Sequence, residues 1–173
     1  DEKGEKTADL ADGLTVDGCE KAAAFVAFCN DCEIPLLTVT AADGFAAVEQ
    51  TEKGLPQAIA KLVKAYHDGG FNSKVNLIMG DTYGSAYVAM GARTVSDADM
   101  VFAWDDAKVG MMEAEKAANI LFAAEGEKAD AKQAAAYEGK QNAVTSAAAR
   151  GSVDAVIAPA QTRKHLIMAF SML

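Results

Sequence analysis

Short apolar runs alternate along this chain with longer segments in which apolar residues recur every three or four positions. The short runs predict β-strands, and the periodic segments predict helices that bury one face. Strands are expected at 34–40, 75–79, 99–104 and 153–157. The first of these runs is mostly apolar, which predicts a strand at the centre of a sheet.

Helices are expected between these strands. The predicted helical segments are 18–31, 55–66, the Ala- and Met-rich run from Gly84 to Gly91, 113–124, one or two helices within 125–149 interrupted at Gly139, and the segment after Pro159. Asp17 and Glu20 have the spacing of a capping box, so Asp17 is expected to cap the first helix. In the helix at 113–124, the side chains expected to face the core are Ala117, Ile120 and Leu121. Gly151 is expected to end a helix in a left-handed conformation.

The order of the elements indicates the fold class. Strands joined by helices of this length require right-handed crossovers and give a mainly parallel sheet. Residues 105–110 are expected to form a loop, and the polar residues 1–14 a tail. Residues 15–173 are therefore predicted to form one α/β domain.

A glycine-containing turn follows the predicted strand at 75–79. Gly80 and Gly84 lead from this strand into a helix that begins near Ser85 and Ala86. The first amides of a helix have no partner within it, and with the helix dipole they can hold a negatively charged oxygen. The same pattern is typical of a plain strand-to-helix turn, and on its own it favours that interpretation.

Composition and charge exclude several classes of function. The chain has 173 residues and a formal net charge of −9, with no basic cluster longer than 163–165. Nucleic acid is therefore not an expected partner. An anionic ligand such as coenzyme A would need local positive charge from Lys74, Arg93 or Lys108, although each is more typical of an ordinary solvated side chain.

No apolar run approaches the roughly 18–20 residues of a membrane span, and no signal sequence is visible at the start, so we expect a cytoplasmic protein. The cysteines Cys19, Cys29 and Cys32 are expected to be reduced and structural, because Cys29 and Cys32 fall at the end of a helix, where the dipole opposes thiolate formation. His67 and His165 stand alone in helical patterns, so no metal site is expected.

Short motifs distributed over residues 17–173 resemble the C-terminal half of the β subunits of biotin-dependent acyl-CoA carboxyltransferases. This group includes propionyl-CoA carboxylase, methylmalonyl-CoA carboxyltransferase and glutaconyl-CoA decarboxylase. The motifs that carry the resemblance are 21–29, Ile34-Pro-Leu-Leu37, Asp43-Gly-Phe45, Tyr83-Gly-Ser-Ala-Tyr87 with Met90, Ala103-Trp104, Met112, Glu115, Ala117, Asn119-Ile-Leu121, Gly151, Asp154, Val156-Ile157, Pro159 and Thr162-Arg163.

The resemblance implies a crotonase/ClpP-like fold, a superhelix of repeated ββα units around a mainly parallel central sheet. It implies that the chain is the half that receives biotin, carried on a biotin carboxyl carrier protein. The acyl-CoA substrate would be held by a separate acyl-CoA-binding half-domain. Homo-oligomers are also expected from the resemblance.

The resemblance further implies a site. The backbone amides of Ser85 and Ala86 correspond to donors that meet the ureido oxygen of biotin as negative charge develops on it. Gly44, Phe45, Gly84, Tyr87 and Val88 match family positions around the cofactor.

Several residues depart from the family pattern at this site. Ser85 stands where a second glycine is usual, Asp43 and Asp105 stand where prolines are usual, and Glu113 and Lys116 replace glycines. The departures leave a second hypothesis open, a non-catalytic assembly domain. A third hypothesis is a stand-alone crotonase-type acyl-CoA enzyme that uses Glu113 or Glu115 as acid or base. A serine hydrolase that uses Ser85 is the weakest, because no histidine is placed beside it.

Overall fold

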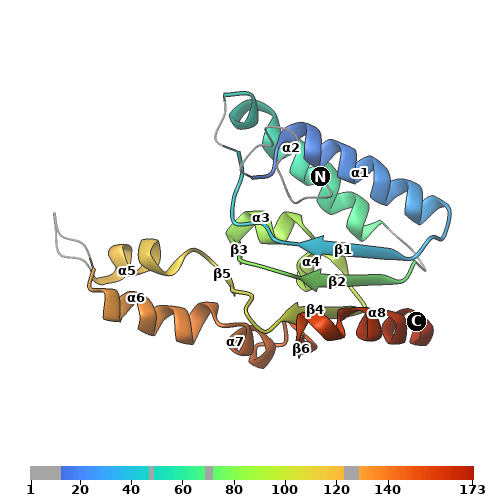
Figure 1. The fold of residues 1–173 in the computed structure, drawn as a ribbon. Helices are drawn as coiled ribbons and strands as arrows, with labels where there is room; N and C mark the ends of the chain where they lie inside the picture. The colour runs from blue at the N-terminus through green and yellow to red at the C-terminus, as the bar shows by residue number, and fades with distance from the viewer. Residues whose placement is uncertain (1–12, 47–48, 69–71, 123–128) are drawn as a thin grey trace, which may run out of the picture.

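A computed structural model describes residues 13–46, 49–68, 72–122 and 129–173 (Figure 1). Its main sheet has four strands in the order β1-β2-β4-β6, and all three neighbouring pairs are parallel. The strands are β1 (Leu36–Thr40), β2 (Lys74–Ile78), β4 (Met100–Trp104) and β6 (Ala155–Ile157). The predicted α/β fold with a parallel sheet is confirmed.

The first strand lies at the edge of the sheet, so the prediction that it is central was wrong. All five residues of β2 are buried, whereas Leu37 and Val39 of β1 are 38% and 42% exposed. Leu36 packs into a core cluster with helices α1 (Val16–Asp31) and α2 (Glu49–His67). An edge strand covered by helices on one face can thus carry as apolar a run as a central strand.

Thr15 caps α1, and the predicted capping role of Asp17 was wrong. Thr15 has extended backbone angles and its hydroxyl accepts a hydrogen bond from the Gly18 amide at 3.0 Å. Asp17 lies in the first turn instead, where its charge favours the helix dipole. Leu14, which was expected in the tail, pairs with Phe45 through a parallel β-bridge and packs against the first core cluster, so it belongs to the folded domain.

Two consecutive ββα units follow one another in the centre of the chain. In the first, β2 leads to β3 (Thr82–Tyr83) and helix α3 (Gly84–Ala89). In the second, β4 leads to β5 (Val109–Gly110) and helix α5 (Ala114–Phe122). β3 and β5 pair in parallel and form a small second sheet, so the expected loop at 105–110 contains a short strand.

Helix α5 does not pack on the main sheet. Figure 1 shows it beside α6 (Ala131–Tyr137), away from the four strands. Ala117 is buried, but Ile120 and Leu121 are 72% and 59% exposed, so their predicted place in the core was wrong. The apolar face of this helix is only partly covered because its neighbour is one short helix.

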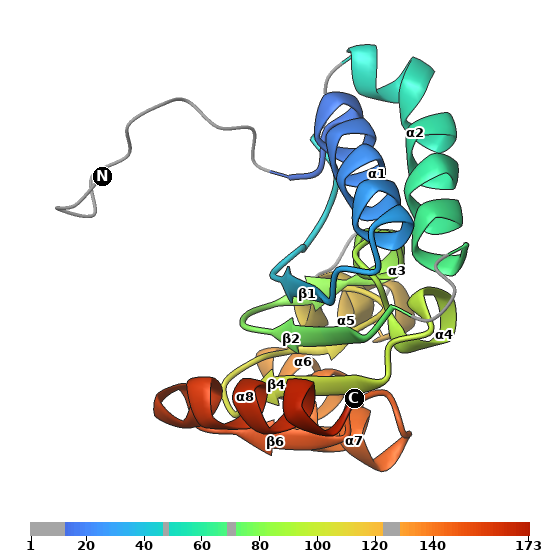
Figure 2. The same cartoon turned by 90° about the vertical axis from the view of Figure 1, so that its right-hand side faces the viewer.

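A π-helical turn, Glu138–Asn142, joins α6 to α7 (Val144–Ala149) and contains Gly139, the predicted interruption. Gly151 follows α7 with a φ of +81°, as expected. Helix α4 (Arg93–Ser96) precedes β4, and η2 (Pro159–Gln161) with α8 (Thr162–Met172) ends the chain. Figure 2 shows α8 beside the sheet and α1 with α2 beyond its β1 edge.

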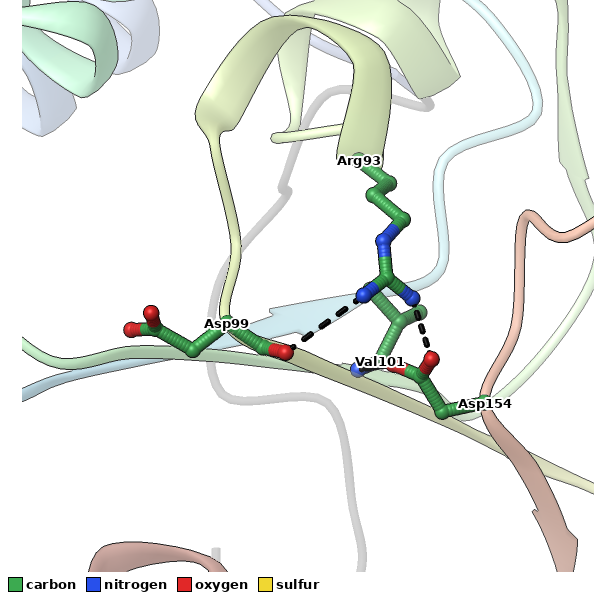
Figure 3. A network of polar contacts seen from close by, with 4 residues as sticks. All are labelled: Arg93, Asp99, Val101 and Asp154. Carbon is green, nitrogen blue, oxygen red and sulfur yellow. Dashed lines mark hydrogen bonds and ion pairs between the residues drawn. The ribbon is translucent and has the colours of Figure 1, made fainter. Parts of the chain in front are cut away.

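Polar contacts fasten the amino ends of the strands (Figure 3). Arg93 forms an ion pair with Asp154 and donates to the carbonyl of Asp99 at 3.5 Å. The other carboxylate oxygen of Asp154 accepts from the amide of Val101 at 2.8 Å. The carboxylate of Asp99 accepts from the amide of Lys74 at 2.8 Å. These contacts hold β2, β4 and β6 in register and leave the carboxyl ends free for a site.

Candidate functional site

A cavity of about 720 Å³ lies beyond the carboxyl ends of β1, β2 and β4. In open parallel α/β sheets, ligands bind at this end of the strands. Four segments contribute to the cavity wall, namely 43–45, Asp81 with 83–86, Lys108 with 111–116, and Ala134, Ala135 and Glu138. The volume falls within the range of small-molecule sites.

The turn between β3 and α3 forms one wall because Gly84 has a left-handed backbone. Its φ is +54°, and a Cβ there would lie 2.9 Å from the carbonyl oxygen of Met111. Only glycine accepts this combination of angle and contact without strain. The left-handed residue turns the chain sharply from the strand into the helix.

This turn leaves the amides of Ser85 and Ala86 ahead of the first acceptor within α3. In the part of the chain that the structure describes, neither amide donates a hydrogen bond to another segment. Both residues line the cavity, with Ser85 exposed and Ala86 buried. Two adjacent backbone donors therefore belong to residues that line the cavity.

The structure brings five of the seven predicted site residues to this cavity. They are Gly44, Phe45, Gly84, Ser85 and Ala86. The other two lie farther along α3, outside the cavity lining. Tyr87 packs against the core cluster around Ile78 and Val101, and Val88 is 39% exposed at the surface.

Hydrogen bonds hold β3 between two neighbouring segments. On one side, the amide of Tyr83 and the hydroxyl of Thr82 donate to the carbonyl of Ala42 at 3.0 and 3.1 Å. On the other side, the amide of Thr82 donates to the carbonyl of Lys108 at 2.8 Å. The turn at Gly84 is thus fixed relative to the segments that follow β1 and β4.

Asn142 supports the cavity wall that faces the turn at Gly84. Its side chain is fully buried and donates from Nδ2 to the carbonyl of Met112 at 2.9 Å. Gly110 makes room for it, because a Cβ there would lie 2.1 Å from the Asn142 Oδ1 atom. Asn142 thereby fixes the stretch of chain whose Met111 carbonyl touches Gly84.

Charged groups surround the cavity in pairs. Lys108 Nζ lies 3.1 Å from Glu138, and Lys116 Nζ lies 2.9 Å from Glu113. The hydrogen bond with Glu138 raises the pKa of Lys108, and nearby carboxylates add to this effect, so the ammonium stays charged. The pKa of Lys116 is raised mainly by its hydrogen bond with Glu113.

Tyr83 adds a neutral donor to this surface. Its hydroxyl lies 3.3 Å from Asp81. Burial, and then the charge of Asp81, raise the pKa of the phenol, which keeps it protonated and able to donate.

The comparisons with known proteins identify the family. The profile of the family described as "Carboxyl transferase domain" matches residues 4–173. This chain belongs to the carboxyl transferase domain family.

Two relatives and one solved structure illustrate the match of this carboxyl transferase domain. It is 39% identical over 166 residues to the methylmalonyl-CoA carboxyltransferase 12S subunit of Propionibacterium freudenreichii subsp. shermanii, covering 92% of this chain and 31% of the relative. It is 37% identical over 175 residues to the propionyl-CoA carboxylase beta chain of Saccharopolyspora erythraea, covering 95% and 32%. The solved structure is a transcarboxylase 12S hexamer with methylmalonyl-coenzyme A and methylmalonic acid bound. It superimposes with a TM-score of 0.85 and 37% identity, over 92% of this chain and 31% of that one.

The carboxyl transferase domain described here spans about a third of the length of the curated relatives it matches. Of the three cationic candidates, only Lys108 lines the cavity. Lys74 is buried and donates to the Tyr66 carbonyl at 2.6 Å, and Arg93 belongs to the contacts at the amino ends of the strands. Glu113 and Glu115, the acid–base residues of the third hypothesis, do line the cavity.

Sequence reasoning missed several residues of the site. Asp81, Tyr83, Met111, Glu138 and Asn142 were not expected to act together. Asp81 was detectable, because it follows a strand just as Asp43 does. Glu138 and Asn142 come from a distant helical segment and left no local signal.

Within the described ranges, few side chains suit histidine-assisted or metal-dependent chemistry at the cavity. Neither His67 nor His165 lines the cavity, and His165 packs its ring against Phe102 at 5.7 Å. In the same residues, no group of His, Cys, Asp and Glu side chains could hold a metal ion, and no helix is long and apolar enough to cross a membrane. Cys19 and Cys29 are buried free thiols, and burial raises the pKa of Cys19.

Proposed function

We propose that this chain is the biotin-side domain of a biotin-dependent acyl-CoA carboxyltransferase. The carboxyl group would pass between N1 of biotin and the α-carbon of an acyl-CoA, with a proton moving in the opposite sense. The observation that carries the proposal is the pair of adjacent amides, Ser85 and Ala86, on the wall of the 720 Å³ cavity.

The residues present fit a biotin ring. The cavity has room for a bicyclic head group, and the two amides give its ureido oxygen a pair of donors. When bound, biotin supplies a nitrogen that holds the carboxyl group and a ureido carbonyl that takes up charge when the N–C bond breaks. Backbone donors fixed at that oxygen stabilise the charge, and each such donor is typically worth a factor of about 10²–10³ in rate.

Main-chain donors are unaffected by the departures from the family pattern. Ser85 retains its N–H, and its side chain is exposed rather than packed into the turn. The left-handed glycine that aims the amides, Gly84, is present. These features favour a working site over the non-catalytic assembly domain.

The rest of the assembly is also proposed. The relatives are named as subunits that act on methylmalonyl-CoA or propionyl-CoA, and the transcarboxylase 12S structure is a hexamer in a multienzyme core. We infer that this domain works in the cytoplasm, in a homo-oligomer, with an acyl-CoA-binding half-domain and a biotin carboxyl carrier protein. Which acyl-CoA it serves, and whether it carboxylates or decarboxylates, depends on that partner half.

The test is a reconstituted transfer. The chain is mixed with the N-terminal half of the P. freudenreichii 12S subunit, methylmalonyl-CoA and biotin methyl ester, and propionyl-CoA formation is followed. Turnover that needs both polypeptides and biotin supports the proposal. Copurification of the halves, with biotin ester neither bound nor carboxylated, would instead support the assembly domain.

A matched pair of variants reports on the amide itself. Ser85→Ala removes the hydroxyl but keeps the N–H, and Ser85→Pro removes the N–H at a position in the first helical turn that accepts proline. We expect kcat to fall about 10²–10³-fold in Ser85→Pro and by no more than a few-fold in Ser85→Ala. Equal losses in the two variants would contradict the role of the amide.

A second candidate function is a stand-alone crotonase-type acyl-CoA enzyme. The observation in its favour is that Glu113 and Glu115 line the same cavity. Glu113 is engaged with Lys116, and carboxylates at the start of a helix commonly complement its dipole. Hydration or thioester cleavage of an acyl-CoA by the chain alone, lost in Glu113→Gln or Glu115→Gln, would favour this candidate.

A further inference from the structure

Lys108 occupies an unusual position among the charged residues of the cavity. Its backbone is fixed on two sides, since its carbonyl accepts from the Thr82 amide at 2.8 Å and it forms an antiparallel bridge with Ala143. Its side chain is 36% exposed and reaches Glu138 at 3.1 Å. A partly exposed ammonium group is thus carried by a rigid stretch of backbone in the cavity wall.

The cavity lining carries more carboxylates than cations, so a bound anion would need the ammonium group of Lys108. The lining carries five carboxylates, Asp43, Asp81, Glu113, Glu115 and Glu138, against two cations, Lys108 and Lys116. Lys116 is 74% exposed and pairs with Glu113, the residue that directly precedes its helix. The Lys108 side chain is less exposed than that of Lys116, so we expect an anion inside the cavity to pair with Lys108.

The Lys108 side chain is not needed to hold its segment in place. The segment is already joined to β3 and to Ala143, which directly follows the π-helical turn, by backbone pairing. Glu138 is the first residue of that π-helical turn, and π-helical turns occur frequently at functional sites. Because the Lys108–Glu138 ion pair is partly exposed, Lys108 can exchange Glu138 for another carboxylate with little loss of free energy.

The group that the proposed reaction moves is itself an anion. It is a carboxylate on biotin before transfer and a carboxylate on the acyl-CoA after it, and it must enter a cavity with an excess of negative charge. We propose that Lys108 binds this carboxylate and releases Glu138 to do so, which makes Lys108 a determinant of specificity for the carboxylated form of the ligand. This inference rests on the proposed function and adds the residue that distinguishes carboxylated from uncarboxylated biotin.

The test uses calorimetry to compare the binding of two biotin methyl esters, in which the side-chain carboxyl group of biotin is blocked. One is biotin methyl ester, and the other is N1-carboxymethyl biotin methyl ester, which carries a stable carboxylate one methylene farther from N1 than the transferred group. The wild-type chain is expected to bind the carboxylated ligand about tenfold more tightly. In Lys108→Met this preference is expected to disappear, and in Lys108→Arg it is expected to persist.

Glu138→Gln separates ligand binding from a merely structural role. If Glu138 competes with the ligand for Lys108, removing its charge strengthens binding of the carboxylated ester. If the pair only holds the wall in place, Glu138→Gln and Lys108→Met weaken binding together. The double variant tests for a general charge effect, because without Lys108 the gain from Glu138→Gln is expected to vanish.

Lys61→Met is the matched control, since Lys61 forms an exposed pair with Glu20 at 2.6 Å and neither residue lines the cavity. The inference is overturned if Lys108→Met keeps the preference, if Lys116→Met loses it instead, or if the wild type binds biotin methyl ester without any preference. Failure of both ligands to bind the wild type rejects the proposed function, and the role of Lys108 with it.

Discussion

Gly84 lies directly against the backbone of Met111, with room between them for a hydrogen atom but not for a methyl group. A Cβ at Gly84 would come within 2.9 Å of the Met111 carbonyl oxygen. This contact joins the turn that carries the two amides to the opposite wall of the cavity. The geometry of the site therefore depends on a glycine that donates no group to a ligand.

Gly84→Ala is expected to lower the free energy of unfolding by at least about 1–2 kcal/mol, the cost of a left-handed non-glycine residue. The close contact with Met111 adds to this cost and displaces the amides. Urea denaturation measures the change, with Gly44→Ala as the control, because no atom lies within 4 Å of a Cβ at that position. Equal stability of the two variants would show that the Gly84 contact does not exist in solution.

Asn142 and Gly110 form a second coupled pair. Asn142→Ala leaves the Met112 carbonyl without its buried donor, which is expected to cost about 1–3 kcal/mol. Gly110→Ala is expected to displace the same side chain, because its Cβ would lie 2.1 Å from Asn142 Oδ1. The double variant should therefore be more stable than the sum of the two single losses predicts. Simple additivity in urea denaturation would contradict the coupling.

Asp154 is expected to matter for stability and not for the site. Asp154→Ala leaves the buried Val101 amide without its acceptor, an expected loss of about 1–3 kcal/mol, whereas Asp154→Asn keeps an oxygen for that amide. Thermal unfolding measures both variants. Since the network lies at the amino ends of the strands, binding of biotin methyl ester should be unchanged in Asp154→Asn, and a weakened affinity would count against this separation (Figure 3).

The Lys108–Glu138 pair predicts a dependence of stability on alkaline pH. The pKa of Lys108 is raised in the folded state, chiefly by its hydrogen bond with Glu138. The stabilisation is therefore complete below the unfolded value, about 10.4, and is lost as the pH rises through the raised folded value. Because the pair is partly exposed, we expect Glu138→Gln to be less stable than wild type by no more than about 1 kcal/mol at pH 9. Melting temperatures that fail to converge towards pH 12 would contradict this account.

The sequence was sufficient for the four strands of the main sheet, their parallel arrangement and the turn at Gly84, because these depend on local patterns of apolar residues and glycines. It was insufficient where a long-range choice decides the outcome. Ile120 and Leu121 have the spacing of a buried face, yet their helix packs on α6 instead of the sheet. Leu37 and Val39 are apolar enough for a central strand, but β1 has a neighbour on one side only.

The candidate site divides in the same way. The turn at Gly84, Ser85 and Ala86 was predictable because glycines follow a short apolar run, whereas Gly44 and Phe45 were expected from the family resemblance alone; all five line the cavity. Glu138, which lines the cavity, and Asn142, which supports its wall, were not predictable, since both belong to a π-helical turn more than 50 residues farther along the chain. No periodicity indicates which distant helix closes a cavity.

The central claim is that the amides of Ser85 and Ala86 donate to the ureido oxygen of biotin. Amide NMR spectra of the ¹⁵N-labelled chain, titrated with biotin methyl ester, test it most directly. The account predicts that these two amide protons shift downfield together and saturate, and that 2-iminobiotin methyl ester, which lacks the ureido oxygen, does not produce the shift. Saturable binding of biotin methyl ester that leaves both resonances in place would contradict it.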